Sequence, residues 1–217
     1  MGDDESRKTT ARMPSVRAPS GAAQALPGIA AQLDNRCRGL CLLPVIAYAR
    51  RLDAEGFLSA VGARDAALAA LIELDGVEAR QWYPMSAFRC VHGALREISG
   101  GLAAARAVGI ESAHSDLTTG IFRTLTKVAS PVFLLERAAM FFRFYVEHGQ
   151  LTFARVSDNE AEARFSDCRG YDEAIFQDLT GGVEGSLFAA GGSQIEIERL
   201  SGGCDGDTHL TLRVRWA

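Results

Sequence analysis

The sequence predicts an α+β fold in which N-terminal helices pack on a mainly antiparallel four-stranded sheet, together with further helices. Three observations lead to this fold class. Apolar residues recur at helical spacing up to Gly149, and the apolar period then falls to two. A further helical stretch and two more alternating segments complete the chain. Segregated helices and strands are typical of α+β proteins, and the change of period separates the two regions.

Length and composition predict one domain preceded by a tail. The chain has 217 residues, of which 47% are hydrophobic, so it can bury a large core without disulfides. Residues 1–26 are rich in Ser, Thr, Arg and Pro and have no apolar period, which is typical of a disordered tail. Residues 27–217 are expected to form a single α+β domain of ligand-binding type.

Charge, apolar run length and cysteine usage argue against nucleic-acid binding, a membrane span and disulfide bonds. A net charge of −4 argues against a general nucleic-acid-binding surface. The longest apolar run, around residues 40–49, is too short to span a membrane. The chain has five widely spaced cysteines and no apolar leader. A cytoplasmic protein with free thiols is therefore expected.

The predicted helices follow stripes of apolar side chains. Their expected ranges are 42–55, 57–72 (one or two helices), 85–98, 102–108 and 121–128. Pro84 suits a first helical turn, and Gly100 suits a helix end. Ser130 as N-cap and Pro131 at the first helical position should begin another helix, which ends near His148.

The predicted strands follow alternating apolar side chains. Leu151 and Phe153 alternate with smaller or polar residues, and residues 161–165 do the same after a turn at Asp158-Asn159, which predicts a hairpin. Residues 171–190 return to a helical pattern. The last two strands are expected at 194–200 and 210–216, joined by a Gly-rich turn.

Motifs for catalysis are absent from the sequence. It contains no dinucleotide-binding glycine motif, P-loop, nucleophile elbow or HExxH sequence. The residue spacing also suggests no nucleophile–base pair and no carboxylate pair. No catalytic residue can therefore be named, and we predict that the protein is not an enzyme.

Cysteines and histidines offer two weak metal-binding patterns. Cys37 and Cys41 would share one face if both lay on a helix, but no second ligand pair completes a site. A three-ligand site of Cys168, Cys204 and His209 would require the fold to bring distant residues together. Buried free cysteine is the favoured interpretation, and neither a metal nor another cofactor is predicted.

Aromatic side chains and one histidine are the candidates for a ligand pocket. Phe142 and Tyr145 belong to an aromatic helix whose circumference is largely apolar, as expected of a helix that lines a cavity or a dimer seam. His92 lies on the stripe of helix 85–98, where a core histidine is the commoner interpretation and a haem or ligand contact is the alternative. Trp82 is the fourth candidate.

The residues from 130 to 216 resemble a superfamily that contains 4-vinyl reductase-type sensor domains, haem-nitric-oxide-binding domains and TRAPP-like trafficking subunits. The resemblance lies in a Ser-Pro helix, a hairpin, a Gly-ended helix and a last strand pair. Its residues are Leu134, Leu135, Phe142, Gly182, Gly185, Gly191, Gly192, Cys204, Asp205, Gly206, Asp207, Val214 and Trp216. Trp82-Tyr83-Pro84 and Gly39-Leu40 resemble an uncharacterised paralogous family found in myxobacteria.

This resemblance implies a compact fold, often dimeric, with an internal pocket for a hydrophobic small molecule. Leu210 stands where relatives often carry a further cysteine, which speaks against a zinc–cysteine site. The Tyr-x-Ser-x-Arg motif that grips haem propionates is also absent. We therefore predict a non-enzymatic sensory or regulatory domain. A TRAPP-like interaction scaffold and a haem-based gas sensor are the alternatives, and a protein partner and a homodimer stay open.

Overall fold

The computed structural model describes residues 35–119 and 131–217, except for the side chains of Val132, Glu136, Ala138 and Ala139. The described residues all belong to one compact unit, Leu33–Ala217. The tail expected at 1–26 and the helix expected at 121–128 lie outside the described residues. The helices are α1 (Gly39–Arg64), α2 (Ala66–Glu73), α3 (Met85–Ser99), α4 (Ala103–Thr118), α6 (Pro131–Phe142) and α7 (Glu173–Ala189). The strands are β1 (Arg36–Arg38), β2 (Trp82–Pro84), β3 (Gln150–Ser157), β4 (Glu160–Ser166), β5 (Glu196–Gly202) and β6 (Leu210–Arg215).

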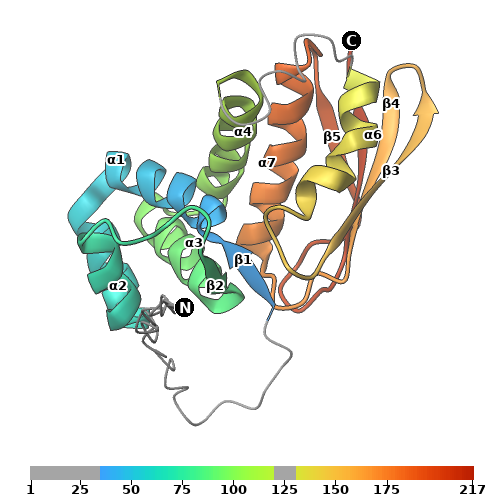
Figure 1. The fold of residues 1–217 in the computed structure, drawn as a ribbon. Helices are drawn as coiled ribbons and strands as arrows, with labels where there is room; N and C mark the ends of the chain where they lie inside the picture. The colour runs from blue at the N-terminus through green and yellow to red at the C-terminus, as the bar shows by residue number, and fades with distance from the viewer. Residues whose placement is uncertain (1–34, 120–130) are drawn as a thin grey trace, which may run out of the picture. The chain divides into compact units, whose positions relative to one another are not determined.

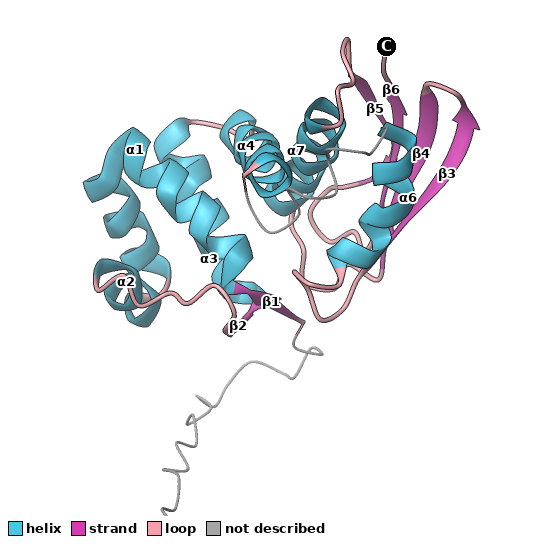
Figure 2. Cartoon of the chain, turned by 45° about the horizontal axis from the view of Figure 1, so that its top comes forward, coloured by secondary structure: helices cyan, strands magenta, loops and turns pink. Residues whose placement is uncertain are grey.

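The α+β class and the four-stranded antiparallel sheet are confirmed. The sheet has the order β3-β4-β6-β5, and every neighbouring pair is antiparallel. Helices α1 to α3 form one group, α4 pairs with α7, and α6 lies against β3 (Figure 1). Figure 2 shows that α6 and α7 lie between the sheet and the N-terminal helices. The N-terminal helices therefore reach the sheet through this middle layer.

Alternation of side chains gives the sheet one apolar and one charged face. Ala163 lies opposite Leu212 in the register, and both are buried. The neighbouring pair Glu162 and Arg213 points to the other face and forms an ion pair of 3.1 Å. A strand alternates its side chains between the two faces, so one face packs on helices while the other meets solvent.

Four local features differ from the sequence predictions, and one of them is that α6 ends at Phe142 rather than near His148. Helix α1 bends at Asp53, whose extended backbone interrupts the helix, rather than ending at Gly56. The Asp53 carboxylate accepts a hydrogen bond from the Gly56 N–H at 2.9 Å, so it caps the second half. Trp82–Pro84 forms a short strand with Arg36–Arg38, a pairing too short to show a period. Helix α4 runs to Thr118, well beyond the predicted residue 108.

Helices α4 and α7 pack backbone against backbone. A Cβ atom on Gly181 would lie 2.0 Å from the Arg106 carbonyl oxygen, and one on Gly109 would lie 2.0 Å from the Asp178 carbonyl oxygen. Only glycine permits such an approach. Among the helices described, none combines the length and apolar character that crossing a membrane would require.

Candidate functional site

A cavity of about 180 Å³ lies where α4, α6 and α7 meet the hairpin and the first turn of α1. Its walls are mostly apolar. Residues from all three layers contribute to them, including Val108, Leu134, Phe142, Leu151, Phe165 and Val183. The volume exceeds that of an engineered cavity of about 150 Å³ that binds benzene, and it is smaller than the roughly 300–1,000 Å³ of drug-sized pockets. The cavity suits a molecule of about one ring.

Strand β1 positions one side of this cavity. The segment after α6 runs antiparallel to β1, with Arg38 N donating to the Tyr145 carbonyl at 2.8 Å and Glu147 N donating to the Arg36 carbonyl at 2.9 Å. These bonds turn the chain sharply after α6 and place Tyr145 and Val146 in the cavity wall.

Tyr145 and Asp116 form a hydrogen-bonded pair in the wall. The Tyr145 hydroxyl donates to the Asp116 Oδ2 atom at 2.5 Å. Burial raises the pKa of Asp116, although the bond from Tyr145 opposes this, and burial also raises the pKa of Tyr145. The nearby Cys41 thiol donates to the Tyr145 carbonyl at 3.5 Å. Hydrogen bonding to Cys37, followed by burial, raises the pKa of Cys41. Cys41 is therefore a neutral thiol.

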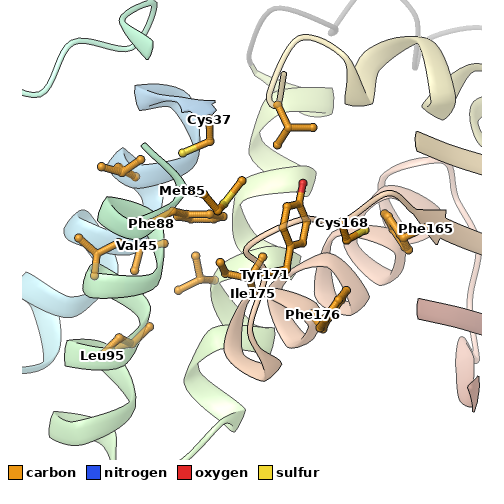
Figure 3. Close-up of a cluster of buried hydrophobic side chains, with 14 of the residues drawn as sticks. Cys37, Val45, Met85, Phe88, Leu95, Phe165, Cys168, Tyr171, Ile175 and Phe176 are labelled. Carbon is orange, nitrogen blue, oxygen red and sulfur yellow. The ribbon is translucent and has the colours of Figure 1, made fainter. Parts of the chain in front are cut away.

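Tyr171 stands at the junction of the layers, between Phe88 of α3 and Phe165 of β4 (Figure 3). It lines the cavity, and its ring packs on that of Phe176 at 5.7 Å between centroids. The hydroxyl is buried and has no hydrogen-bond partner among the described residues. Burial raises the pKa of Tyr171 well above its usual range. The cavity wall thus includes a protonated phenol whose hydroxyl makes no hydrogen bond with the described residues.

Asp178 links the cavity to α3. Its carboxylate lies in the wall, and its Oδ2 atom is 3.2 Å from His92 Nε2. His92 itself is fully buried behind the wall, where its ring meets Phe88 edge-on at 4.7 Å. The second ring nitrogen, Nδ1, has no partner in the described part of the chain.

The four predicted pocket residues fall into two groups. Phe142 and Tyr145 line the cavity. His92 does not line it and contacts its wall through Asp178 and Phe88. Trp82 lies outside it, in a separate open hollow, where the guanidinium of Arg38 stacks on its ring at 4.4 Å. The assignment of these residues to a ligand site stays a prediction.

Sequence reasoning missed Tyr171, Asp116 and Asp178. Asp178 had a readable signal, because it falls on the stripe of α7 that also carries Ile175 and Gly182, at intervals of three and four. A carboxylate on an apolar stripe marks a polar contact in the interior. Tyr171 had no such signal, since it precedes α7 in a loop where no period applies.

Metal binding finds no support in the described residues. Cys37 lies on β1 and Cys41 on α1, so the two do not share a helix as the sequence suggested. Cys168 is buried, whereas Cys204 is exposed. Within residues 35–119 and 131–217, no group of three His, Cys, Asp or Glu side chains is arranged to hold an ion.

The fold is similar to that of several solved haem-binding domains. An oxygen-binding H-NOX domain related to soluble guanylate cyclases matches with a TM-score of 0.57 and 16% identity, covering 82% of this chain and 94% of that one. An Fe(II) unliganded H-NOX variant from K. algicida matches with a TM-score of 0.62 and 10% identity, covering 83% and 96%. An H-NOX variant from T. Tengcongensis gives 0.58 and 15%, covering 82% and 97%. The predicted likeness to haem-nitric-oxide-binding domains is thus confirmed for the fold.

Haem does not fit the residues that line this cavity. All four histidines of the chain are described, and none is in the wall. Among the described residues, the charged side chains that line the cavity are the carboxylates of Asp116 and Asp178, which would repel haem propionates. Of the oxygen and sulfur donors, Tyr145 is hydrogen-bonded to Asp116 and Cys41 to the Tyr145 carbonyl. The cavity of about 180 Å³ is also smaller than pockets for drug-sized ligands.

Sequence comparison places the chain in a family. No protein with a curated description matches it. The predicted likeness to a myxobacterial family stays a prediction. A profile described as a protein of unknown function (DUF2378) matches residues 51–217, most of the chain. The chain therefore belongs to the DUF2378 family of proteins of unknown function.

Proposed function

We propose that this protein is a non-enzymatic sensory domain that binds a small, largely apolar molecule in the cavity between α4, α6, α7 and the sheet. The observation that carries the proposal is the cavity itself, about 180 Å³ with mainly apolar walls drawn from every layer of the fold. The likeness in fold to sensor domains supports it.

The energetic cost of an empty cavity supports a ligand. Protein interiors are close-packed and contain few voids larger than a water molecule. At about 24 cal/mol per Å³, a fully enclosed and unfilled void of this size would cost roughly 4 kcal/mol of stability, and a partly open one costs less. A bound apolar molecule would offset that cost by filling the space.

Binding of 4-fluorotoluene, followed by fluorine NMR, tests the proposal directly. We expect saturable binding to the wild-type chain. The Val183→Phe variant adds a ring to the buried wall of the cavity and should abolish binding. The control is Val156→Phe, the same substitution at a residue that is 56% exposed on β3. Binding that Val183→Phe does not change would place the ligand elsewhere, and no binding at all would favour the interaction-scaffold alternative.

Haem-based gas sensing is the second candidate, and the fold likeness to H-NOX domains favours it. A visible spectrum of the purified and haem-reconstituted protein decides between the two. A Soret band that is lost in His92→Ala would support haem, because it would require His92 to leave Asp178 and enter the cavity. We expect a colourless protein, with any retained ligand seen as extra mass in native mass spectrometry.

A further inference from the structure

Tyr171 lines the cavity, and its buried hydroxyl makes no hydrogen bond with the described residues. Tyr171 is 5% exposed and lies in the wall. A Cβ atom on Gly149 would lie 3.3 Å from the Tyr171 hydroxyl and 3.1 Å from Phe142 Cε1. The hydroxyl therefore lies beside Phe142 and Val146, two other residues of the wall. Glycine at position 149 leaves space next to it.

The polar groups near this hydroxyl are already engaged. Burial raises the pKa of Tyr171, and the Asn35 amide lies close enough to the Tyr171 hydroxyl to oppose that rise. The two N–H groups of the amide nevertheless donate to the carbonyls of His148 and Arg169, each at 3.0 Å, so the hydroxyl makes no well-formed hydrogen bond with it. The amide oxygen accepts from His148 N at 2.9 Å. The Cys168 thiol donates to the Ser166 carbonyl at 3.7 Å. No described residue supplies a hydrogen-bond partner for the Tyr171 hydroxyl.

An unmade hydrogen bond in the interior is costly, because the group has given up water without replacement. Native proteins therefore rarely leave a buried hydroxyl unpaired, and such a group calls for an explanation. Two explanations apply to a hydroxyl at a cavity wall, namely an ordered water and an atom of the natural ligand.

The remaining polar groups of the wall define what the ligand is not. The Tyr145 hydroxyl is already committed to Asp116 at 2.5 Å, so Tyr171 is the open donor. The carboxyl groups of Asp116 and Asp178 disfavour an anionic ligand. Each carboxyl already has a neighbouring group within the protein, Tyr145 for Asp116 and His92 for Asp178, so neither requires a cationic ligand as its partner. A neutral molecule meets these conditions.

We propose that the natural ligand is a neutral, single-ring-sized molecule with one oxygen atom that accepts a hydrogen bond from Tyr171, as a phenol, aryl ether or aryl ketone would. This inference rests on the proposed function and makes it more specific. The apolar walls hold the ring, and the Tyr171 hydroxyl selects for the oxygen.

The test compares two probes of the same shape in matched variants. Dissociation constants for 4-fluorophenol and 4-fluorotoluene are measured by fluorine NMR on the full chain and on Tyr171→Phe. For each protein we take the ratio of the two dissociation constants. The probes are hydrated equally whichever protein is used, so their difference in hydration cancels when the ratio for wild type is compared with the ratio for the variant. We expect Tyr171→Phe to reduce the preference for the phenol by about three- to tenfold, the range that one net hydrogen bond provides.

Tyr83→Phe is the matched control. Tyr83 is also a buried tyrosine, but its hydroxyl accepts from the Glu78 N–H at 2.9 Å and it does not line the cavity. We expect its probe preference to equal that of the wild type. An unchanged preference in Tyr171→Phe would overturn the inference while fluorotoluene binding still upheld the cavity. Failure of both probes to bind would overturn the proposed function as well.

A second measurement does not depend on any variant. In wild type, the free energy of binding of each probe is corrected by its free energy of transfer from water to a hydrocarbon. After this correction 4-fluoroanisole should bind more tightly than 4-fluoroethylbenzene, because the two have nearly the same shape and only the ether oxygen accepts a hydrogen bond. Equal corrected free energies, or a more favourable value for 4-fluoroethylbenzene, would mean that water or no partner satisfies Tyr171, and would also overturn the inference.

Discussion

Neighbouring glycines of α7 should respond to the same substitution with opposite sign. Gly181 and Gly182 both lie inside the helix, and alanine is the better helix former by about 1 kcal/mol at each. They differ in what surrounds them. A Cβ atom at position 181 meets the backbone of α4, whereas a Cβ atom at position 182 meets nothing within 4 Å.

The magnitude for Gly181→Ala follows from the contact distance. The added Cβ would lie 2.0 Å from the Arg106 carbonyl oxygen and 3.0 Å from the Ile110 nitrogen, so the helices would have to move apart by more than an ångström. Overpacking costs typically about 1–3 kcal/mol, and more where backbone must move. After subtracting the gain of about 1 kcal/mol in helix propensity, we expect a net loss of roughly 2 kcal/mol.

Thermal unfolding followed by circular dichroism measures both effects. In a chain of this length, 1 kcal/mol shifts the Tm by roughly 2–4 °C. Gly181→Ala should therefore lower the Tm by about 4–8 °C, and Gly182→Ala should raise it by about 2–4 °C. Shifts of the same sign and size in the two variants would refute the backbone contact between α4 and α7.

Three further predictions follow from buried polar groups. Replacing His92 by leucine leaves the largely buried Asp178 carboxylate without its partner at 3.2 Å, and should lower the free energy of unfolding by about 2 kcal/mol in urea; a loss that persists when Asp178 is also replaced by leucine would speak against the pair. Burial raises the pKa of Asp116, so the Asp116 carboxyl binds a proton more readily in the folded chain than in the unfolded chain. The free energy of unfolding therefore falls as the pH rises through the raised pKa. Asp116→Asn should therefore stabilise the protein in urea at neutral pH, with a gain that shrinks towards about pH 4, and a pH-independent difference would contradict the shift. Thiol reagents should modify exposed Cys204 before Cys168, because burial raises the pKa of Cys168 to about 12, and simultaneous labelling would contradict this order.

Sequence patterns predicted most of the fold because the relevant forces are local and periodic. Residues 161–165 and 210–214 alternate strictly, and their register pairs buried side chains such as Ala163 and Leu212. The end of α3 at Gly100 was readable because only glycine adopts its φ of 75° without strain. The β1–β2 pair was missed because three residues cannot show a period. The bend at Asp53 was misplaced because the capping aspartate, rather than Gly56, interrupts the helix.

The site was less readable than the fold, because it depends on contacts between distant segments. Phe142 and Tyr145 were found on an aromatic helix pattern, and both line the cavity. Asp116 and Tyr145 are brought together only when the segment after α6 pairs with β1. No spacing in the sequence shows that Tyr171 makes no hydrogen bond with the described residues, since an unmade bond is a property of the packed interior.

Fold and cavity chemistry together explain how a domain of this shape could bind a ligand other than haem. The architecture determines where the cavity lies, because α4, α6, α7 and the sheet meet there, and the lining side chains determine what fills it. Here the histidines lie outside the wall, the acidic groups are paired, and Tyr171 is left open. A ligand that fills this space adds contacts to every layer at once, so binding stabilises the whole folded unit by mass action. A rise in Tm with ligand concentration should therefore report binding. The helices that surround the cavity are the elements through which a structural change on binding would be transmitted.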